Sequence, residues 1–270
     1  MNVIVAVKQV PEISDVQVNP ETGTLVREGV ASILNPFCEY ALDHALRLKA
    51  VWPEIRITAV SMGPPQARSV LQRALELGAD RAVLASDRKF AGADTWATAL
   101  TLAATIRLKV PDYRLILVGK QAIDGDTAQV GPEMAEILNL PQISYGTGIE
   151  LDTRKKKIRV RREIENGWQI LEARIPALVS VSKGEIVRRA PSFADVVAAR
   201  SKPIDMVNAS DLGIPDEELG LFGSFTQVVR IFPPPAREKG RMVSDVGPGE
   251  AGQVIYQFLK DKGFLDRSVV

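Results

Sequence analysis

The chain has 270 residues, and 46% of them are hydrophobic, so it can bury a large core as one domain or as a domain with an appendage. Its 34 basic and 33 acidic residues leave a formal charge of +1, which gives no global field toward nucleic acid or a membrane surface. One cysteine, Cys38, and one histidine, His44, exclude an internal disulfide, a thiolate metal cluster and a multi-histidine metal site within this chain.

The first strand is expected at Val3 to Val7, where apolar residues follow one another almost without a break, as in a strand covered on both faces. No basic region or cleavage site precedes it, and no apolar run reaches the roughly 18 residues of a membrane span. We therefore expect a cytoplasmic protein without direct membrane insertion. Association with a membrane-bound complex stays open.

An amphipathic helix is predicted from Phe37 to about Ala50, since Asn35-Pro36 suits a helix start. His44 lies at the border of its apolar stripe and is interpreted as a structural or solvated histidine rather than a catalytic one. Cys38 is interpreted as a small buried filler, although a position so near the helix start could also line a site.

Further strands and helices then alternate about every thirty residues. Strands are predicted at 55–60 and 81–85, with helices ending at Gly78 and covering about 96–108. Because right-handed crossovers between parallel strands need this spacing, we predict an α/β fold with a doubly wound, mostly parallel, Rossmann-like sheet.

The stretch 113–132 carries the strongest local signal. The apolar run Leu115 to Val118 stops at Gly119, a polar loop follows, and a helical pattern begins near Thr127. In a parallel sheet this order places the loop at a strand's carboxyl end beside a helix amino terminus, where free N–H groups favour a phosphate. The alternative is that Asp124 and Asp126 only cap the helix and turn the loop.

Past Pro141 the pattern changes to a β-hairpin, with strands at 157–163 and 168–175 around Asn166-Gly167 and a last core strand at 176–181. The run 154–162 is basic except for Ile158 and Val160. We interpret it as the solvated, charged edge of the hairpin rather than as a nucleic-acid site, because no aromatic residues are interleaved.

The chain divides in this interpretation into a nucleotide-binding domain, 1–187, and a C-terminal arm, 188–270. The arm should contain a helical stretch at 190–200, a strand at 227–232 and a helix at about 249–262. It has too little apolar pattern for a core of its own, so we expect it to pack on a partner subunit.

Strand ends converge on one edge of the predicted sheet and form a nucleotide crevice there. The sequence contains neither G-x-x-x-x-G-K-[ST] nor G-x-G-x-x-G, and one histidine gives no convincing catalytic triad. The candidate phosphate contacts are the backbone amides of 125–130 and the Thr127 hydroxyl, with the side-chain amide of Gln129 beside them. The carboxylates of Asp124 and Asp126 must be capped or turned away, because they would otherwise repel the phosphate. The residues favour binding over hydrolysis.

Several motifs together resemble the beta subunit of electron transfer flavoprotein. They are Val5-Ala-Val-Lys-Gln-Val-Pro11, Asn35-Pro-Phe-Cys38, Ser61-Met-Gly-Pro64 and, most specifically, Gly119-Lys-Gln-Ala-Ile-Asp-Gly-Asp-Thr-Ala-Gln-Val-Gly-Pro132. The resemblance implies an obligate heterodimer with an alpha subunit that carries the electron-transferring FAD, while this chain holds an adenine nucleotide. The lining residues that it implies are Ala6, Asn35, Pro36, Phe37, Cys38, Met62, Gly63, Gly119, Lys120, Gln121, Ala122, Ile123, Asp124, Gly125, Asp126, Thr127, Ala128, Gln129 and Val130.

Two branches of that family differ in the nucleotide. Ordinary members keep a structural AMP, whereas electron-bifurcating and nitrogen-fixation-type members hold a second FAD that receives hydride from NADH. The segment Asp87-Arg-Lys-Phe-Ala-Gly-Ala-Asp-Thr95 is similar to the bifurcating pattern, as is Val160-Arg-Arg-Glu163 with Glu172. The resemblance therefore favours FAD, with Arg88, Asp94 and Thr95 as further cofactor contacts; the alternative for Asp94 and Thr95 is that they cap the next helix.

A loop after the last core strand anchors redox partners in this family. Its counterpart here would present Phe193, flanked by Arg188 and Arg189, although packing of the short helix would also explain Phe193. The resemblance implies redox partners such as an acyl-CoA dehydrogenase, a quinone oxidoreductase, or ferredoxin or flavodoxin, and no nucleic acid. A non-redox scaffold that keeps AMP is the main alternative, and an adenylate-using hydrolase is a distant one.

Overall fold

The computed structural model describes residues 1–12, 31–184, 190–229, 240 and 242–265. Two compact units are present, Met1–Ile231 and Phe232–Val270, and each is described by itself. Across these described ranges, no helix combines the length and the apolar character needed to cross a bilayer.

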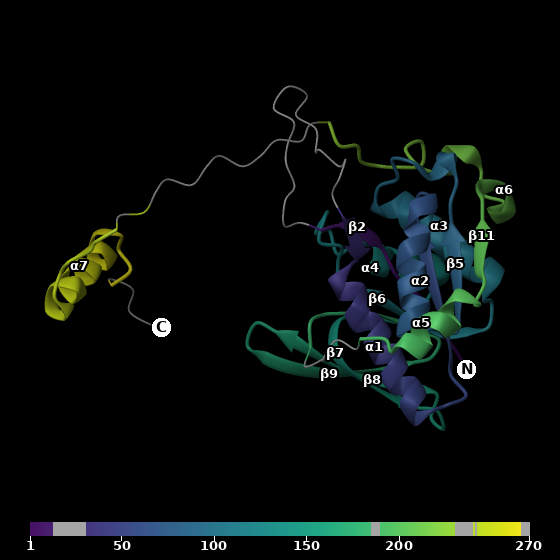
Figure 1. Ribbon diagram of the computed structural model, residues 1–270, viewed down its shortest axis with the longest axis horizontal. Coiled ribbons are helices and arrows are strands. Elements are labelled where there is room, and N and C mark those ends of the chain that lie inside the picture. Colours follow the sequence, from purple (N-terminus) through teal and green to yellow (C-terminus); the bar gives the residue numbers. More distant parts are fainter. Residues whose placement is uncertain (13–30, 185–189, 230–239, 241, 266–270) are drawn as a thin grey trace. The chain divides into compact units, whose positions relative to one another are not determined.

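The first unit is built on a sheet of nine described strands (Figure 1). The strands from β11 to β7 run parallel to their neighbours, and β8 and β9 add an antiparallel edge. This confirms the predicted fold class and the added hairpin. The order across the sheet is β11 (Ile204–Val207), β5 (Arg81–Ala85), β4 (Arg56–Met62), β1 (Asn2–Ala6), β6 (Tyr113–Gly119), β10 (Ala177–Val181), β7 (Gln142–Asp152), β8 (Lys157–Ile164) and β9 (Gly167–Arg174).

Helices cover both faces of this sheet, as a doubly wound fold requires. One apolar core lies under α1 (Pro36–Val51), α2 (Arg68–Leu77) and α5 (Phe193–Arg200), and a second lies under α3 (Thr95–Lys109) and α4 (Val130–Leu138). The central strands β1 and β6 contribute buried residues to both cores, which explains their continuous apolar runs. Two helices begin about three residues later than expected: α4 at Val130 instead of near Thr127, and α5 at Phe193 instead of near 190.

The hairpin is a charged edge, as predicted. Ile158 and Val160 of β8 are fully buried, while basic residues between and beyond them are exposed. Lys157 pairs with Glu172 across the strands at 3.2 Å, and Arg159 reaches Glu150 at 3.9 Å. Such charges discourage further pairing at the sheet edge.

The C-terminal region differs from its expected organisation. Residues 190–229, which the sequence analysis assigned to the arm, belong to the first unit, where β11 pairs with β5 and α5 packs against α2. The strand expected at 227–232 is wrong in its described part, because 227–229 have no regular structure. In the second unit, α7 (Pro248–Asp261) matches the expected helix, and none of its residues is buried.

Several short elements were not anticipated. β2 (Gln9–Pro11) and β3 (Ser32–Leu34) form a separate antiparallel ladder just before α1. The others are single turns in loops: η2 (Pro65–Ala67), η3 (Arg88–Phe90), α6 (Ala209–Leu212) and η4 (Asp216–Glu218). Elements of three or four residues carry too little periodicity to be read from sequence.

Candidate nucleotide-binding site

Three central strands end together at the carboxyl edge of the sheet. Ala6 at the end of β1 lies in register with Val60 of β4 and Val118 of β6. The strand ends therefore bring Ala6, Met62 and Gly119 to neighbouring positions on one edge. This is the place where an open α/β sheet binds its ligand.

Gly119 is the point where the start of α1 crosses the end of β6. A Cβ atom at this glycine would stand 2.8 Å from both the backbone nitrogen of Cys38 and the carbonyl carbon of Phe37. Real Cβ atoms do not approach backbone so closely, so only glycine fits here. The motif Asn35 to Cys38 is thereby held against the loop that follows Gly119.

Asn35 ties that loop to α1 with its side chain, which is 1% exposed. Its Nδ2 donates to the carbonyl oxygen of Gln121 at 2.8 Å, and its Oδ1 accepts the N–H of Ile123 at 3.2 Å. The role of Asn35 is therefore to shape the loop. Beside it, burial raises the pKa of the Cys38 thiol, so Cys38 is a buried neutral filler rather than a nucleophile.

The two loop carboxylates both have partners. Lys8 Nζ lies 2.8 and 2.9 Å from the two oxygens of Asp124, and Gln121 Nε2 donates to Asp126 Oδ1 at 2.6 Å. An anion could not bind beside two free carboxylates. The structure meets this requirement by pairing one acid with a cation and the other with an amide.

The backbone from 126 to 130 forms a cradle of N–H groups. Asp126 and Ala128 both adopt positive φ angles, 51° and 56°, which turn successive amides toward one side. Within the described residues, the N–H groups of Thr127, Ala128 and Gln129 have no hydrogen-bond acceptor. Gln129 also leaves the amino terminus of α4 without a side-chain cap. Free amides at an uncapped helix start fit a phosphate group.

Thr95 connects the second motif, 87–95, to this cradle. Its Oγ1 lies 3.0 Å from Glu133 Oε1 and 3.4 Å from Gln129 Oε1, both at the start of α4. The other oxygen of Glu133 is buried without a partner, and burial raises the pKa of this carboxyl. Glu133 could not be predicted as a site residue, because nothing in its local sequence separates it from an ordinary helix residue.

Asp94 caps α3, as the structural alternative supposed. Its Oδ1 accepts the N–H of Ala97 at 3.1 Å, and its Oδ2 accepts the N–H and the hydroxyl of Thr226 at 2.9 and 3.1 Å. Burial alone would raise the pKa of Asp94, but these hydrogen bonds hold it below its ordinary value. The carboxylate is therefore already engaged within this chain.

The segment Gly220–Thr226 lies over the 87–95 loop and was missed by sequence reasoning. Gly220 has a φ of 54° and lies so close to the carbonyl oxygens of Lys89 and Ala91 that no side chain would fit. Leu221 N–H donates to the Ala91 carbonyl at 3.0 Å, and Ser224 Oγ accepts the N–H of Asp94 at 2.8 Å. These contacts fix the loop, while the Arg88 side chain is exposed and has no partner among the described residues.

Phe193, the expected partner anchor, is 85% exposed at the first turn of α5. A capping box between Ser192 and Asp195 begins that helix, and Phe193 is its first residue. Packing of the short helix therefore does not explain this phenylalanine. Arg188 and Arg189, its expected flanks, lie outside the described residues.

Comparison with known proteins gives the family. The model of the electron transfer flavoprotein domain matches residues 22–212. This chain belongs to the electron transfer flavoprotein family, with the beta subunits. It is 43% identical over 265 residues to the caffeyl-CoA reductase-Etf complex subunit CarD of Acetobacterium woodii, covering 98% of this chain and all of that one.

Two further relatives are similar to this chain over most of their length. The electron transfer flavoprotein subunit beta of Clostridium acetobutylicum is 41% identical, covering 98% of this chain and 100% of that protein. Protein FixA of Azorhizobium caulinodans is 41% identical, covering 93% of this chain and 92% of that protein. The likeness therefore includes the sheet, both motif loops and the C-terminal region of this beta subunit.

Proposed function

We propose that this beta subunit forms a heterodimer with an electron transfer flavoprotein alpha subunit and holds a second FAD in the crevice at the carboxyl edge of its sheet. The flavin would accept hydride from NADH and pass single electrons to a high-potential and a low-potential acceptor. This chain supplies the binding site and its electrostatics.

The observation that carries the proposal is the link from Thr95 to Glu133 and Gln129. It joins the loop whose sequence resembles the bifurcating branch to the amide cradle that fits a phosphate. A nucleotide held by the cradle would therefore border the 87–95 loop as well. A structural AMP would need the cradle alone, whereas a larger dinucleotide could also contact this loop.

Each residue then has a definite task. The free N–H groups of Thr127, Ala128 and Gln129 would hold the diphosphate, and Asn35 keeps them in position by fixing the preceding turn. Lys8 offsets the charge of Asp124, and Gln121 holds the carboxylate of Asp126 by a hydrogen bond, so neither acid is left free beside the anion. Arg88, an exposed cation without a partner among the described residues, is available to the cofactor or to NADH.

The partner subunit is supported by exposed apolar surface. On α7, Ile255, Tyr256 and Phe258 are each more than half exposed although the helix is amphipathic. An apolar stripe of this kind is stable only when another surface covers it. We assign it to the alpha subunit and assign Phe193 to a redox partner.

The names of the relatives support an assembly with redox enzymes. CarD is named as a subunit of a complex with caffeyl-CoA reductase. For this chain we propose an acyl-CoA dehydrogenase or a quinone oxidoreductase as the high-potential partner, and ferredoxin or flavodoxin as the low-potential one.

The second candidate is a structural AMP in the same cradle. It is favoured by the engagement of Asp94, whose oxygens are taken by Ala97 and Thr226. An AMP site would need only the N–H groups of 127–129 and would leave the 87–95 loop as a helix cap. The NADH reaction of the purified heterodimer separates the two candidates.

Anaerobic titration of the heterodimer with NADH is the test. We expect NADH to bleach flavin absorbance equivalent to two flavins per heterodimer. The variant Thr95→Val should retain less FAD on this chain, since it loses the hydroxyl that joins the loop to α4. Thr98→Val, one turn along α3, is the matched control and should titrate like the wild type. Absence of NADH-dependent bleaching in the wild type would contradict the proposal.

A further inference from the structure

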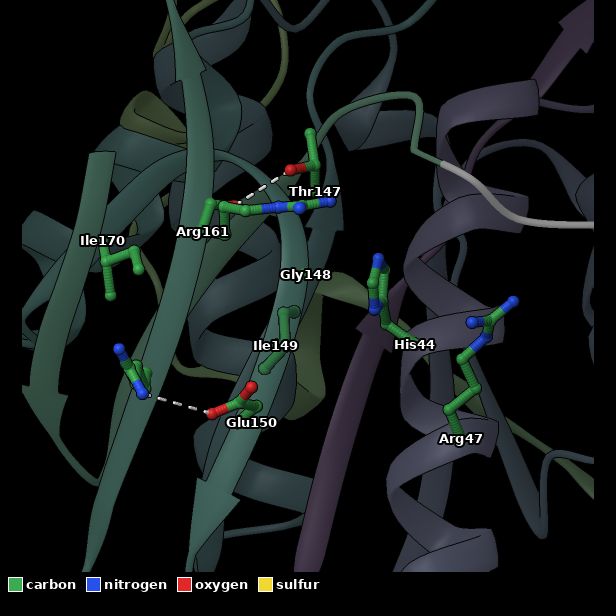
Figure 2. A pocket seen from close by; sticks show the side chains of 9 residues that line it. His44, Arg47, Thr147, Gly148, Ile149, Glu150, Arg161 and Ile170 are labelled. Atoms are coloured by element: carbon green, nitrogen blue, oxygen red, sulfur yellow. Dashed lines mark hydrogen bonds and ion pairs between the residues drawn. The ribbon is translucent and has the colours of Figure 1, made fainter. Parts of the chain in front are cut away.

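A second pocket lies away from the nucleotide crevice, between α1 and the hairpin (Figure 2). Its volume is about 440 Å³, enough for a small metabolite. The proposed nucleotide site does not include its lining, and of the family motifs only Val160–Glu163 contributes to it, through Arg161. The lining residues are His44, Arg47, Thr147, Gly148, Ile149, Glu150, Arg159, Arg161 and Ile170.

A β-bulge shapes one wall of this pocket. Gly146 pairs with Arg162 and Gly148 pairs with Arg161, so Thr147 is an extra residue on β7. Its hydroxyl donates to the carbonyl oxygen of Arg161 at 3.1 Å. Bulges of this kind bend a strand and redirect its side chains, and they are frequent beside binding sites.

His44 points into the pocket from α1, as Figure 2 shows. Its side chain is only 5% exposed, and its Nε2 is buried without a hydrogen-bond partner. A buried polar atom of this kind carries a free-energy cost unless something binds to it. The charged groups around it are Asp43 and Arg47 on its own helix, Glu150 on β7, and Arg159 and Arg161 on β8.

The charges of this pocket do not cancel. Arg47 pairs with Asp43 at 2.6 Å, and Arg159 reaches Glu150 at 3.9 Å. Arg161 has no carboxylate partner among the described residues; its guanidinium stacks over the Trp168 ring, 4.6 Å from the centroid. One arginine fork and one imidazole nitrogen therefore remain for a ligand, and both can donate hydrogen bonds.

We propose that this pocket binds an oxyanion, a carboxylate or a phosphate group, between Arg161 and His44. An arginine fork matches the two oxygens of such a group, and a neutral imidazole with its proton on Nε2 donates to one of them. This pocket is separate from the nucleotide site, because it lies between α1 and the hairpin and shares none of the residues assigned to the nucleotide.

The single histidine of the chain makes the test direct, because this chain gives one imidazole signal. Isotope-labelled full-length chain is titrated with inorganic phosphate, and sodium chloride of equal ionic strength is the reference. We expect a saturable shift of the His44 resonance. Its titration midpoint, which burial lowers to about pKa 4, should rise by at least about one unit in phosphate. A response no larger than in sodium chloride would overturn the proposal.

Two variants connect the effect to the pocket. Arg161→Gln should weaken phosphate binding at least about tenfold, since it removes a charge-assisted contact. Arg162→Gln is the matched control on the opposite face of β8, where Arg162 binds Gln169 at 2.9 Å, and should bind phosphate like the wild type. Arg161→Lys, which keeps the charge, should retain part of the affinity. Equal losses in Arg161→Gln and Arg162→Gln would overturn the assignment.

The source of the anion is tested by assembly with the alpha subunit. If the ligand is a free metabolite, phosphate shifts the His44 signal equally in the chain and in the heterodimer. If it is an acidic side chain of the alpha subunit, assembly itself shifts the signal in an Arg161-dependent way and phosphate has no further effect. Either result supports an oxyanion site, whereas a heterodimer whose His44 responds to neither overturns it.

Discussion

Asn35 and Gln121 are 86 residues apart in sequence, and the side-chain amide of the first donates to the carbonyl of the second at 2.8 Å. With the bond from Ile123 N–H to Asn35 Oδ1, this contact joins the start of α1 to the loop that carries the amide cradle. The cradle is therefore set by tertiary contacts from a neighbouring helix as well as by the loop's own residues.

Removing this contact should loosen the cradle. Asn35→Ala leaves the carbonyl of Gln121 and the N–H of Ile123 without partners, which should cost about 1–3 kcal/mol of stability and at least about tenfold in nucleotide affinity. Urea unfolding and nucleotide retention after gel filtration measure the two effects. Asn2→Ala, which removes an exposed contact to Asp112, is the control. An Asn35→Ala protein with unchanged retention would contradict the role assigned to Asn35.

Gly119, at the end of β6, and Gly125, in the loop that follows, should differ in how strongly their substitution lowers stability. Gly119→Ala forces a Cβ against the backbone of Phe37 and Cys38 and should lower stability by about 1–3 kcal/mol. Gly125→Ala meets nothing within 4 Å and should change stability by less than about 0.5 kcal/mol. Thermal unfolding compares the variants. Equal destabilisation would show that α1 does not press on Gly119 in the way described.

The parallel sheet was predictable because each of its central strands is a continuous apolar run, and β5 was predicted with its observed bounds. The edge strand β11 was not, since the four residues Ile204–Val207 include Asp205 and a half-exposed Met206. An edge strand needs apolar residues on one face only. Its sequence therefore resembles a loop, and its place was wrongly assigned to the arm.

The loop motif 119–130 identified the cradle, but the partners of its residues could not be derived. Asp94 illustrates why: the sequence offered helix capping or cofactor contact, and the deciding partner, Thr226, lies 132 residues away. The pocket of His44 was missed for the same reason, because α1 and the hairpin approach each other only in the fold. Sequence pattern gives the local element, and long-range pairs come from packing.

The single histidine also predicts how stability depends on pH. Burial lowers the pKa of His44 to about 4, so between about pH 6.5 and pH 4 the unfolded chain takes up a proton that the folded chain does not. Stability should therefore fall as the pH falls through this range, by on the order of 3 kcal/mol in total. His44→Gln should flatten the curve there. Parallel curves for wild type and variant in urea unfolding would contradict this account.

The apolar stripe of α7 predicts a change on assembly. None of its residues is buried within this chain, so backbone amides of 249–261 should exchange rapidly in the isolated chain. Binding to the alpha subunit should slow their exchange by at least about tenfold, as the helix gains a surface to pack on. Hydrogen exchange followed by mass spectrometry measures this. Comparable protection in both states would count against a partner-binding role for α7.

The nucleotide content of the purified heterodimer tests the central claim most directly. Denaturation, chromatography and mass identification of the released nucleotides give their number and kind. Two FAD molecules per heterodimer are predicted, one of them held by the cradle at residues 127–129. One FAD and one AMP per heterodimer would contradict the flavin site and leave this chain with a structural nucleotide.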